Sequence, residues 1–447
     1  MKEQQHIFTN KMLRTLLIPV IFEQVLNSLM GTVDTMMVSN VGSAAISAVS
    51  LVDSINVLVI QAFSALAAGG AILCSQYIGQ KNHEMANKSA RQVLFIITAI
   101  SVAVTALCLL FRVPLLKLIF GKVESDVMTA SQVYFFYTAL SFPFIALYDA
   151  GASIFRSQGN TRGPMTVSVI SNVINIGGNA ALIWGFNMGV AGAAIATLAS
   201  RVFCAVVVLW QLRMDRQPIV VRNYRQIRPD GKMIGRILAL GIPSGIENSM
   251  FQLGKIIVLS LVSTFGTYAI AANAVSNAIA LFQILPGMAI TLAIIPVISR
   301  CVGAGDYEQA KYYNKKLMLI TYVSMTAMVL FIFSLLPFIL NAYNLSDLTA
   351  KTTADIIHFH GIGAIFIWPV AFSLPATFRA AGDAKACMYI SSISMWIFRI
   401  GFSYVLGKYM GMGVFGIWVA MVIDWVFRAM CFVIRYFKGS WKKNAIV

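Results

Sequence analysis

Charged side chains are scarce in this chain. Asp, Glu, Lys and Arg make up 11% of its 447 residues, whereas soluble proteins carry about 25% of these residues. Hydrophobic residues make up 58%, and the mean hydropathy is +0.78. This composition excludes a soluble globular domain and predicts a chain that crosses a membrane many times.

The sequence patterns of enzymes, metal sites and nucleic-acid binding are missing as well. The six cysteines are scattered without paired Cys/His spacing, so we expect neither a disulfide framework nor a metal site of that kind. No P-loop, HExxH or nucleophile pattern occurs, which argues against an enzyme, an ATP-driven pump and any cofactor. The net charge of +17 does not indicate nucleic-acid binding, because the basic residues lie in loops between apolar segments.

Twelve apolar segments are present, each with the length of about 20 residues that a helix needs to cross a bilayer. They predict an all-α polytopic membrane protein. The predicted spans are 13–37, 46–74, 92–111, 131–153, 164–185, 189–212, 237–263, 270–298, 317–340, 356–377, 387–407 and 413–437.

The loops predict the orientation of these spans. If both termini lie inside, 25 of the 34 Lys and Arg residues lie on that side and only 5 on the other. Such a bias is typical of cytoplasmic loops. We therefore expect a multi-pass protein of the plasma membrane (the inner membrane where there are two), with both termini in the cytoplasm.

The second half of the chain repeats the first. At a shift of 224 residues Pro19, Glu23 and Gly42 meet Pro243, Glu247 and Gly266, and FRSQGNTRGPM (155–165) meets FRAAGDAKACM (378–388) at a shift of 223. We predict an N-terminal six-helix lobe (1–212), a basic cytoplasmic linker (213–236) and a C-terminal six-helix lobe (237–447). Two pseudo-symmetric lobes around a central cleft are typical of alternating-access transporters.

These features resemble the multidrug and toxic compound extrusion (MATE) family of bacterial antiporters over nearly the whole length. The resemblance rests on VDTMM (33–37), SQYIGQKNHEMANK (75–88), FRSQGNTRGPM and GVAGAAIATLAS (189–200). It implies a secondary active exporter of amphipathic, cationic small molecules in antiport with Na⁺ or H⁺. We expect a monomer that contacts membrane lipids and binds no nucleic acid.

Asp34 lies deep within the first span. An ionisable side chain at that depth costs on the order of 2.5–3.5 kcal/mol on insertion scales, which makes it a candidate functional residue. Glu23 and Asn27 share its helix face, because positions i, i+4 and i+11 fall close together around a helix. This face must point into the protein or a wet cavity, where the three side chains either bind ligand or join helices.

Span 5 carries a polar stripe of Asn172, Asn175 and Asn179. Asparagine oxygens are hard-cation ligands, but asparagines also join helices through hydrogen bonds. The resemblance implies a coupling-cation site at Asp34, Asn175, Asn179, Ala193 and Thr197, and no other metal site. Some family members have Asp in place of Asn179; its absence here mildly favours Na⁺ over a proton relay.

Other charges in the spans have open interpretations. Glu247, Asp149 and Asp53, with Glu23, Asn27 and Asn172, are candidates for substrate or coupling contacts. Lys255, two turns after Glu247, could instead neutralise it. Asp424 and Arg428 have the i, i+4 spacing of a structural ion pair.

An alternative function is a flippase of a lipid-linked saccharide or another lipid precursor. That function predicts a cavity rich in arginine to hold a pyrophosphate. The four basic residues within the spans are dispersed along the chain.

Overall fold

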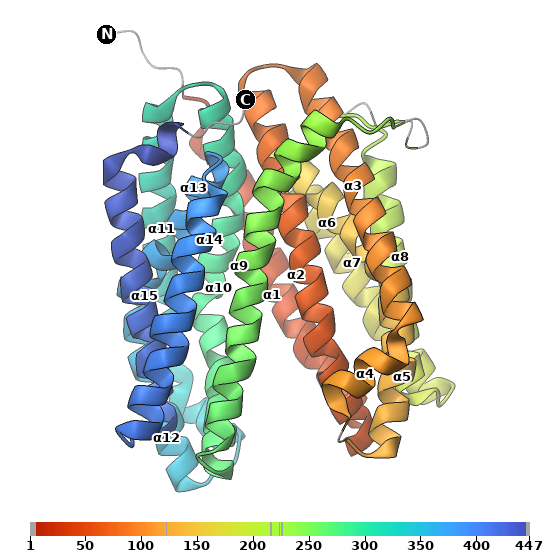
Figure 1. The fold of residues 1–447 in the computed structure, drawn as a ribbon, viewed down its shortest axis with the longest axis vertical. Helices are drawn as coiled ribbons and strands as arrows, with labels where there is room; N and C mark the ends of the chain where they lie inside the picture. Colours follow the sequence, from red (N-terminus) through yellow and green to blue (C-terminus); the bar gives the residue numbers. More distant parts are fainter. Residues whose placement is uncertain (1–5, 122, 215–216, 223, 225–226, 444–447) are drawn as a thin grey trace. The chain divides into compact units, whose positions relative to one another are not determined.

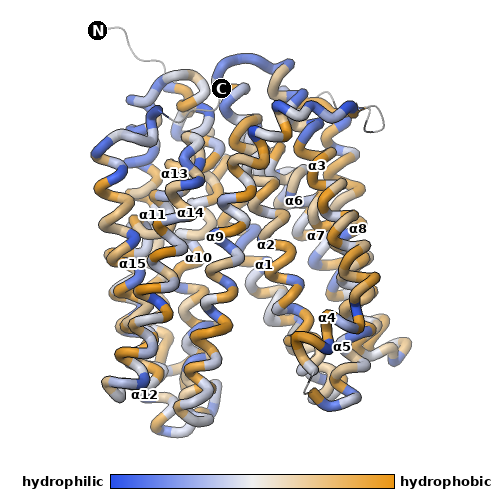
Figure 2. The backbone as a smooth tube through the Cα atoms, viewed as in Figure 1, coloured by the Kyte–Doolittle hydropathy of each residue, from blue (hydrophilic) through white to orange (hydrophobic). Residues whose placement is uncertain are grey.

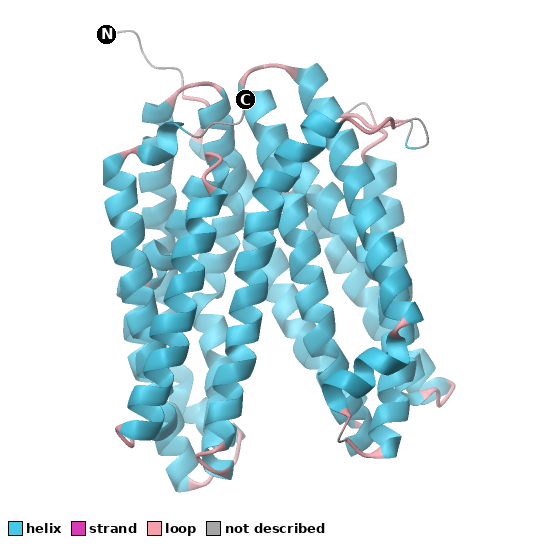
Figure 3. Cartoon of the chain, viewed as in Figure 1, coloured by secondary structure: helices cyan, strands magenta, loops and turns pink. Residues whose placement is uncertain are grey.

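A computed structural model describes residues 6–121, 123–214, 217–222, 224 and 227–443. Helices make up almost all of this part of the chain, and its residues contain no strand (Figures 1 and 3). The helices form two compact units, Thr9–Gly245 and Met1–Phe8 with Ile246–Val447. The boundary between the units falls within one helix, α9 (Gly231–Ser263).

Apart from its part of α9, the first unit is built from the eight helices before α9, and the second unit from the helices after it. In the first unit these are α1 (Asn10–Ser39), α2 (Ser43–Gly79), α3 (His83–Leu110), α4 (Arg112–Phe120), α5 (Ser125–Leu140), α6 (Phe142–Ser157), α7 (Arg162–Asn179) with the π-helical η1 (Ala180–Gly185), and α8 (Gly189–Gln211). In the second they are α10 (Thr267–Gly303), α11 (Tyr307–Ala342), α12 (Asp347–Phe366), η3 (Pro369–Ser373), α13 (Leu374–Ala380), α14 (Ala384–Ile393), η4 (Ser394–Gly401), η5 (Ser403–Tyr409), α15 (Gly413–Lys438) and η6 (Ser440–Lys443).

Most of these helices are long and apolar enough to cross a membrane. Nine helical segments of the described chain meet this requirement, and two bent pairs raise the number to eleven. The remaining predicted span, 237–263, lies within α9 and carries both Glu247 and Lys255. Hydrophobic residues predominate along the helices of each unit in Figure 2, and hydrophilic residues are frequent at their ends.

The two bent pairs correspond to predicted spans 131–153 and 356–377. Helices α5 and α6 meet at 42°, and α12 meets η3 and α13 at 59°. Pro143 lies in the first turn of α6 and Pro369 begins η3. Proline lacks the N–H that continues a helix, so each bend has a local cause.

The internal repeat predicted from the sequence is confirmed in the fold. In the first unit α2 packs against α3, α5 and α6, and in the second α10 packs against α11, α12 and α13. The caps repeat too: Asn82 Oδ1 accepts from the Met85 N–H, and 224 residues later Asp306 Oδ1 accepts from the Gln309 N–H. Both copies therefore fold by the same local signals.

The copies differ in length by one residue late in the repeat. The sequence shift changes from 223 to 224 between the FR motifs and the start of α15, so the second copy has one extra residue there. The π-helical η4 lies in this interval. A residue inserted into an α-helix is accommodated as a π-bulge, which explains the local geometry.

Candidate functional site

Asp34 of α1 is joined to the polar stripe of α7. The Asn179 amide donates to Asp34 Oδ1 at 2.9 Å. One amide atom of Asn175 lies 2.7 Å from the same oxygen, and the other lies 3.3 Å from Thr197 Oγ1. Turned with its NH₂ group toward Asp34, Asn175 donates to the carboxylate. The four side chains thus form one connected polar group, the Asp34 cluster.

Small residues bring the elements of the Asp34 cluster together. A Cβ on Gly178 would lie 2.9 Å from Ala196 Cβ, so glycine is what allows α7 and α8 to approach here. Ala193, buried on α8 one turn before Thr197, lies in the same stretch. Directly after Asn179 the helix changes to the π form of η1, a geometry often found at functional sites.

The second copy of the repeat has a different chemistry at these positions. At a shift of 224, Val258 stands in place of Asp34 and Ser403 in place of Asn179. The carboxylate–amide arrangement therefore belongs to the first copy. The fold itself does not require it, because the second copy forms the same helices without it.

The rest of the α1 stripe also contacts neighbouring helices. Asn27 Oδ1 accepts from Ser168 Oγ at 2.9 Å and from Asn172 Nδ2 at 3.1 Å. The predicted stripe of α1 thus lies against the predicted stripe of α7. Asn172 therefore bonds to Asn27 and lies beside the Asp34 cluster without being one of its four members.

Glu23 and Glu247 are each bonded to an arginine that the sequence analysis did not assign. Arg156 Nη2 lies 3.0 Å from Glu23 Oε1, and Arg379 Nη2 lies 2.8 Å from Glu247 Oε1. The alternative that Lys255 neutralises Glu247 is wrong, because Lys255 lies over the Phe251 ring at 4.8 Å. Its side chain points to an aromatic ring, and Arg379 and Ser391 bond to Glu247 instead. The internal repeat could have indicated these two arginine–glutamate pairs, because both glutamates and both FR motifs recur together.

Asp53 and Asp149 lie in a second polar group of the first unit. Asp53 Oδ1 accepts from Asn56 at 3.0 Å and from the Tyr134 hydroxyl at 3.3 Å. Asp149 accepts from the Ser64 hydroxyl. Arg201 is within electrostatic range of both aspartates. Each acid thus has neutral donors and a nearby base.

Asp424 and Arg428 are buried together on α15. Arg428 Nε lies 3.1 Å from Asp424 Oδ1, and Ser394 Oγ also donates to this carboxylate. Arg428 Nη2 donates in addition to the Ser391 carbonyl at 3.2 Å. These bonds join α15 to α14 and η4.

A duplicated set of membrane-crossing helices, with a partly buried acid–amide cluster in one copy, defines a two-lobed membrane transporter. The MatE family model matches the chain twice, at residues 19–181 and 243–405. The chain therefore belongs to the MatE family, and the resemblance seen in the sequence is confirmed. The two matches are offset by the same 224 residues as the internal repeat. Its relatives are transporters rather than enzymes.

Named relatives cover nearly the whole chain. A probable multidrug resistance protein NorM of Thermotoga maritima is 25% identical over 98% of this chain and 94% of its own length. An uncharacterized transporter YisQ of Bacillus subtilis is 28% identical, over 95% and 93%. Probable multidrug resistance protein YoeA of the same organism is 26% identical, over 96% and 94%.

Solved structures share the fold. A multidrug resistance MATE family transporter in an outward-facing conformation superposes with a TM-score of 0.90 and 21% identity, covering 97% of both chains. A MATE structure in a bent conformation gives 0.88 and 20%, covering 98% of this chain and 97% of the other. At these identities the likeness concerns the two-lobe fold.

Proposed function

We propose that this protein is a secondary active exporter that binds Na⁺ or H⁺ at Asp34 and moves its substrate by alternating access of two lobes around a cleft. The Asp34 cluster carries this proposal. It combines one carboxylate with amide and hydroxyl groups within the membrane-spanning helices. An ionisable side chain at such a depth is costly, so its presence favours a functional role.

The Asn175 amide can stabilise the ion-free state of the Asp34 cluster. With its NH₂ group toward Asp34, it donates to an ionised carboxylate. When a cation binds, rotation of the amide turns its carbonyl oxygen toward the ion. One amide therefore suits both the unloaded and the loaded site.

The ligands favour one of the two ions. Asn175, Asn179, Thr197 and the Ala193 carbonyl would supply neutral oxygens to Na⁺, a ligand set that hard cations prefer. A proton needs only the Asp34 carboxylate. Because Asn179 adds no second carboxylate, the cluster favours Na⁺ over a proton relay.

Ion binding can drive export only through linkage. The ion shifts the equilibrium between outward-open and inward-open states by its difference in affinity for the two. Substrate binding must then compete with the ion or be coupled to it. We propose amphipathic organic cations as substrates. The multidrug names of the relatives support export of small molecules over lipid flipping.

Three of the arginines also weigh against the flippase alternative. A pyrophosphate site needs converging, available guanidinium groups. Arg156, Arg379 and Arg428 are instead bonded to Glu23, Glu247 and Asp424.

We further propose a monomer with both termini in the cytoplasm. This orientation rests on the excess of Lys and Arg in the loops that follow even-numbered spans. Multi-pass insertion in the plasma membrane (the inner membrane where there are two) follows from the same bias.

Dye efflux from proteoliposomes tests the function. Na⁺ and pH gradients are imposed separately on wild type, Asp34→Asn and the exposed-acid control Glu308→Gln. We expect efflux to follow one gradient, to vanish in Asp34→Asn and to persist in Glu308→Gln. Efflux that ignores both gradients, or that survives in Asp34→Asn, would overturn the proposal.

A further inference from the structure

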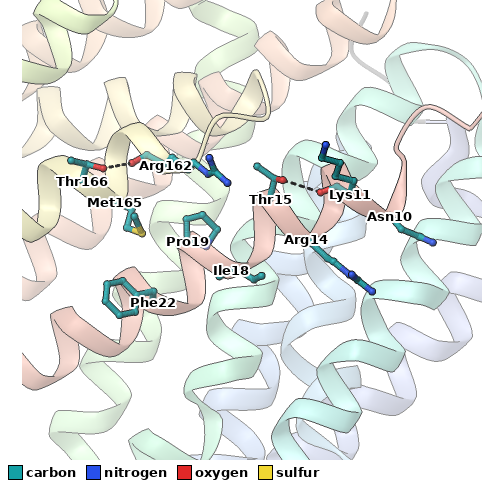
Figure 4. A pocket seen from close by; sticks show the side chains of 10 residues that line it. All are labelled: Asn10, Lys11, Arg14, Thr15, Ile18, Pro19, Phe22, Arg162, Met165 and Thr166. Atoms are coloured by element: carbon teal, nitrogen blue, oxygen red, sulfur yellow. Dashed lines mark hydrogen bonds between the residues drawn. The ribbon is translucent and has the colours of Figure 1, made fainter.

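A pocket lies between the first turns of α1 and α7 in the first unit, and nothing in the proposed transport cycle uses it. Its volume is about 570 Å³ (Figure 4). One part of its lining is basic, formed by Lys11, Arg14 and Arg162. The other part is apolar and includes Ile18 and Phe22.

The basic part of the pocket is suited to an anion. Among the lining residues none is acidic, and the three cations have no ion pair with a carboxylate among the described residues. Helices α1 and α7 both begin here, so both positive dipole ends contribute. The Thr15 and Thr166 hydroxyls donate to the Lys11 and Arg162 carbonyls, as Figure 4 shows.

The apolar part continues along α1 from the basic part. Lys11, Ile18 and Phe22 are spaced seven and four residues apart, which places them on one helix face. At 1.5 Å per residue this face extends about 16 Å, close to the ~15 Å hydrocarbon depth of one leaflet. Ile18 and Phe22 are 64% and 51% exposed. The acyl chain of a lipid whose phosphate is bound at the basic part could therefore lie along this apolar face.

The fold does not by itself require these charges. At a shift of 224, Gly235 and Leu238 stand in place of Lys11 and Arg14, although the second copy forms the equivalent helices. Only Arg162 has a basic counterpart, Lys385, at the shift of 223. The concentration of three cations around one pocket is therefore a property of the first copy.

We propose that this pocket binds an anionic glycerophospholipid of the cytoplasmic leaflet. Its phosphate contacts Lys11, Arg14 and Arg162, and an acyl chain lies along Ile18 and Phe22. Basic pockets between membrane helices on the cytoplasmic side are suited to such headgroups. A cationic export substrate does not fit, because three like charges repel it. The proposal needs the predicted orientation but not the proposed transport activity.

Native mass spectrometry of the purified full chain tests the proposal. The probe is dioleoyl phosphatidylglycerol, compared with dioleoyl phosphatidylcholine and inorganic phosphate. The variant Lys11→Gln/Arg14→Gln/Arg162→Gln is matched by Arg91→Gln/Lys315→Gln/Lys385→Gln, which removes three exposed cations elsewhere on the predicted cytoplasmic side. We expect the pocket variant to lose about tenfold or more in phosphatidylglycerol affinity, and the control to retain it.

Two further variants separate a lipid from a free anion and from misfolding. Ile18→Gln/Phe22→Gln should weaken dioleoyl phosphatidylglycerol but leave short-chain dihexanoyl phosphatidylglycerol unchanged. Lys11→Arg/Arg14→Lys/Arg162→Lys should restore binding if charge is what the pocket supplies. Equal losses in the pocket and control triples, or inorganic phosphate that competes fully with the lipid, would overturn the proposal.

Discussion

Arg156 Nη2 lies 3.0 Å from Glu23 Oε1, and the second copy of the repeat forms the same bond between Arg379 and Glu247 at 2.8 Å. Both glutamates are buried, with Glu23 2% exposed. In each case the bond connects the start of a lobe to the helix that ends in an FR motif. Its recurrence in two copies with different functional residues marks it as part of the scaffold.

Removing one member of this pair should destabilise the fold. Glu23→Gln leaves Arg156 charged, largely shielded from solvent with 16% of its side chain exposed, and without its carboxylate, at a cost of roughly 3–5 kcal/mol. Glu247→Gln should have a similar effect. Thermal unfolding of the purified protein measures both, with the exposed Glu308→Gln as control.

The double variant separates pairing from simple loss of polar groups. Glu23→Gln/Arg156→Gln should lower the melting temperature by less than the sum of the two single changes, because neither charge is left alone. An unchanged melting temperature in Glu23→Gln, together with lost transport, would assign Glu23 to coupling instead.

The sequence alone predicted the two-copy helical fold, but it did not predict the arginine partners of Glu23 and Glu247. Apolar length predicted the spans, and the shift of 224 predicted the two copies. The bends at Pro143 and Pro369 lie where a helix loses a hydrogen bond. Proline alone did not predict which helices would bend, however. Pro286 and Pro296 lie inside the continuous helix α10.

The candidate site was predicted in part because helix periodicity is local. The faces of Asp34 and of Asn175 and Asn179 could be placed by spacing. Arg156 and Arg379 could not be assigned to Glu23 and Glu247 in this way, since each pair is separated by more than a hundred residues. Nor did spacing along α9 predict that Lys255 would contact Phe251 rather than Glu247.

The Asn175 amide should distinguish Na⁺ from H⁺ coupling. If Na⁺ is the ion, Asn175→Leu removes an oxygen ligand and should raise the half-saturating Na⁺ concentration about tenfold or more. If H⁺ is the ion, the same change removes a donor to the ionised Asp34 carboxylate and should shift the pH midpoint of transport upward. Ion-dependent efflux in proteoliposomes measures both.

Asn172→Leu is the matched control for that substitution. It has the same residue type one turn away on α7, but its amide donates to Asn27 rather than to Asp34. We expect nearly wild-type ion dependence. Equal shifts in the two variants would contradict a specific role for Asn175 in the Asp34 cluster.

Gly178 should be sensitive to the smallest side chain. A Cβ there would lie 2.9 Å from Ala196 Cβ, so Gly178→Ala must push α7 from α8 and should cost about 1–3 kcal/mol. Gly177→Ala has nothing within 4 Å and should be neutral or slightly stabilising. Thermal unfolding compares the two. Similar melting temperatures would mean that the helices adjust freely.

Asp230 should contribute to stability in a pH-dependent way at the start of α9. Its Oδ1 accepts from the Lys232 and Met233 N–H groups at 3.0 and 3.1 Å, and Lys88 Nζ lies 2.5 Å from its Oδ2. The hydrogen bond from Lys88, with those from the backbone, lowers the pKa of Asp230 below its ordinary value of 3.8.

Because this pKa is lower in the folded state, the stabilisation is present above pH 3.8 and is lost as pH falls through the lowered value. We expect Asp230→Ala to speed hydrogen exchange in the first turn of α9 at neutral pH. Asp230→Asn retains a capping oxygen and should have a smaller effect, while Lys88→Gln removes only the ion pair. If Asp230→Ala and Lys88→Gln gave the same exchange rates, the ion pair rather than the cap would hold this end of α9.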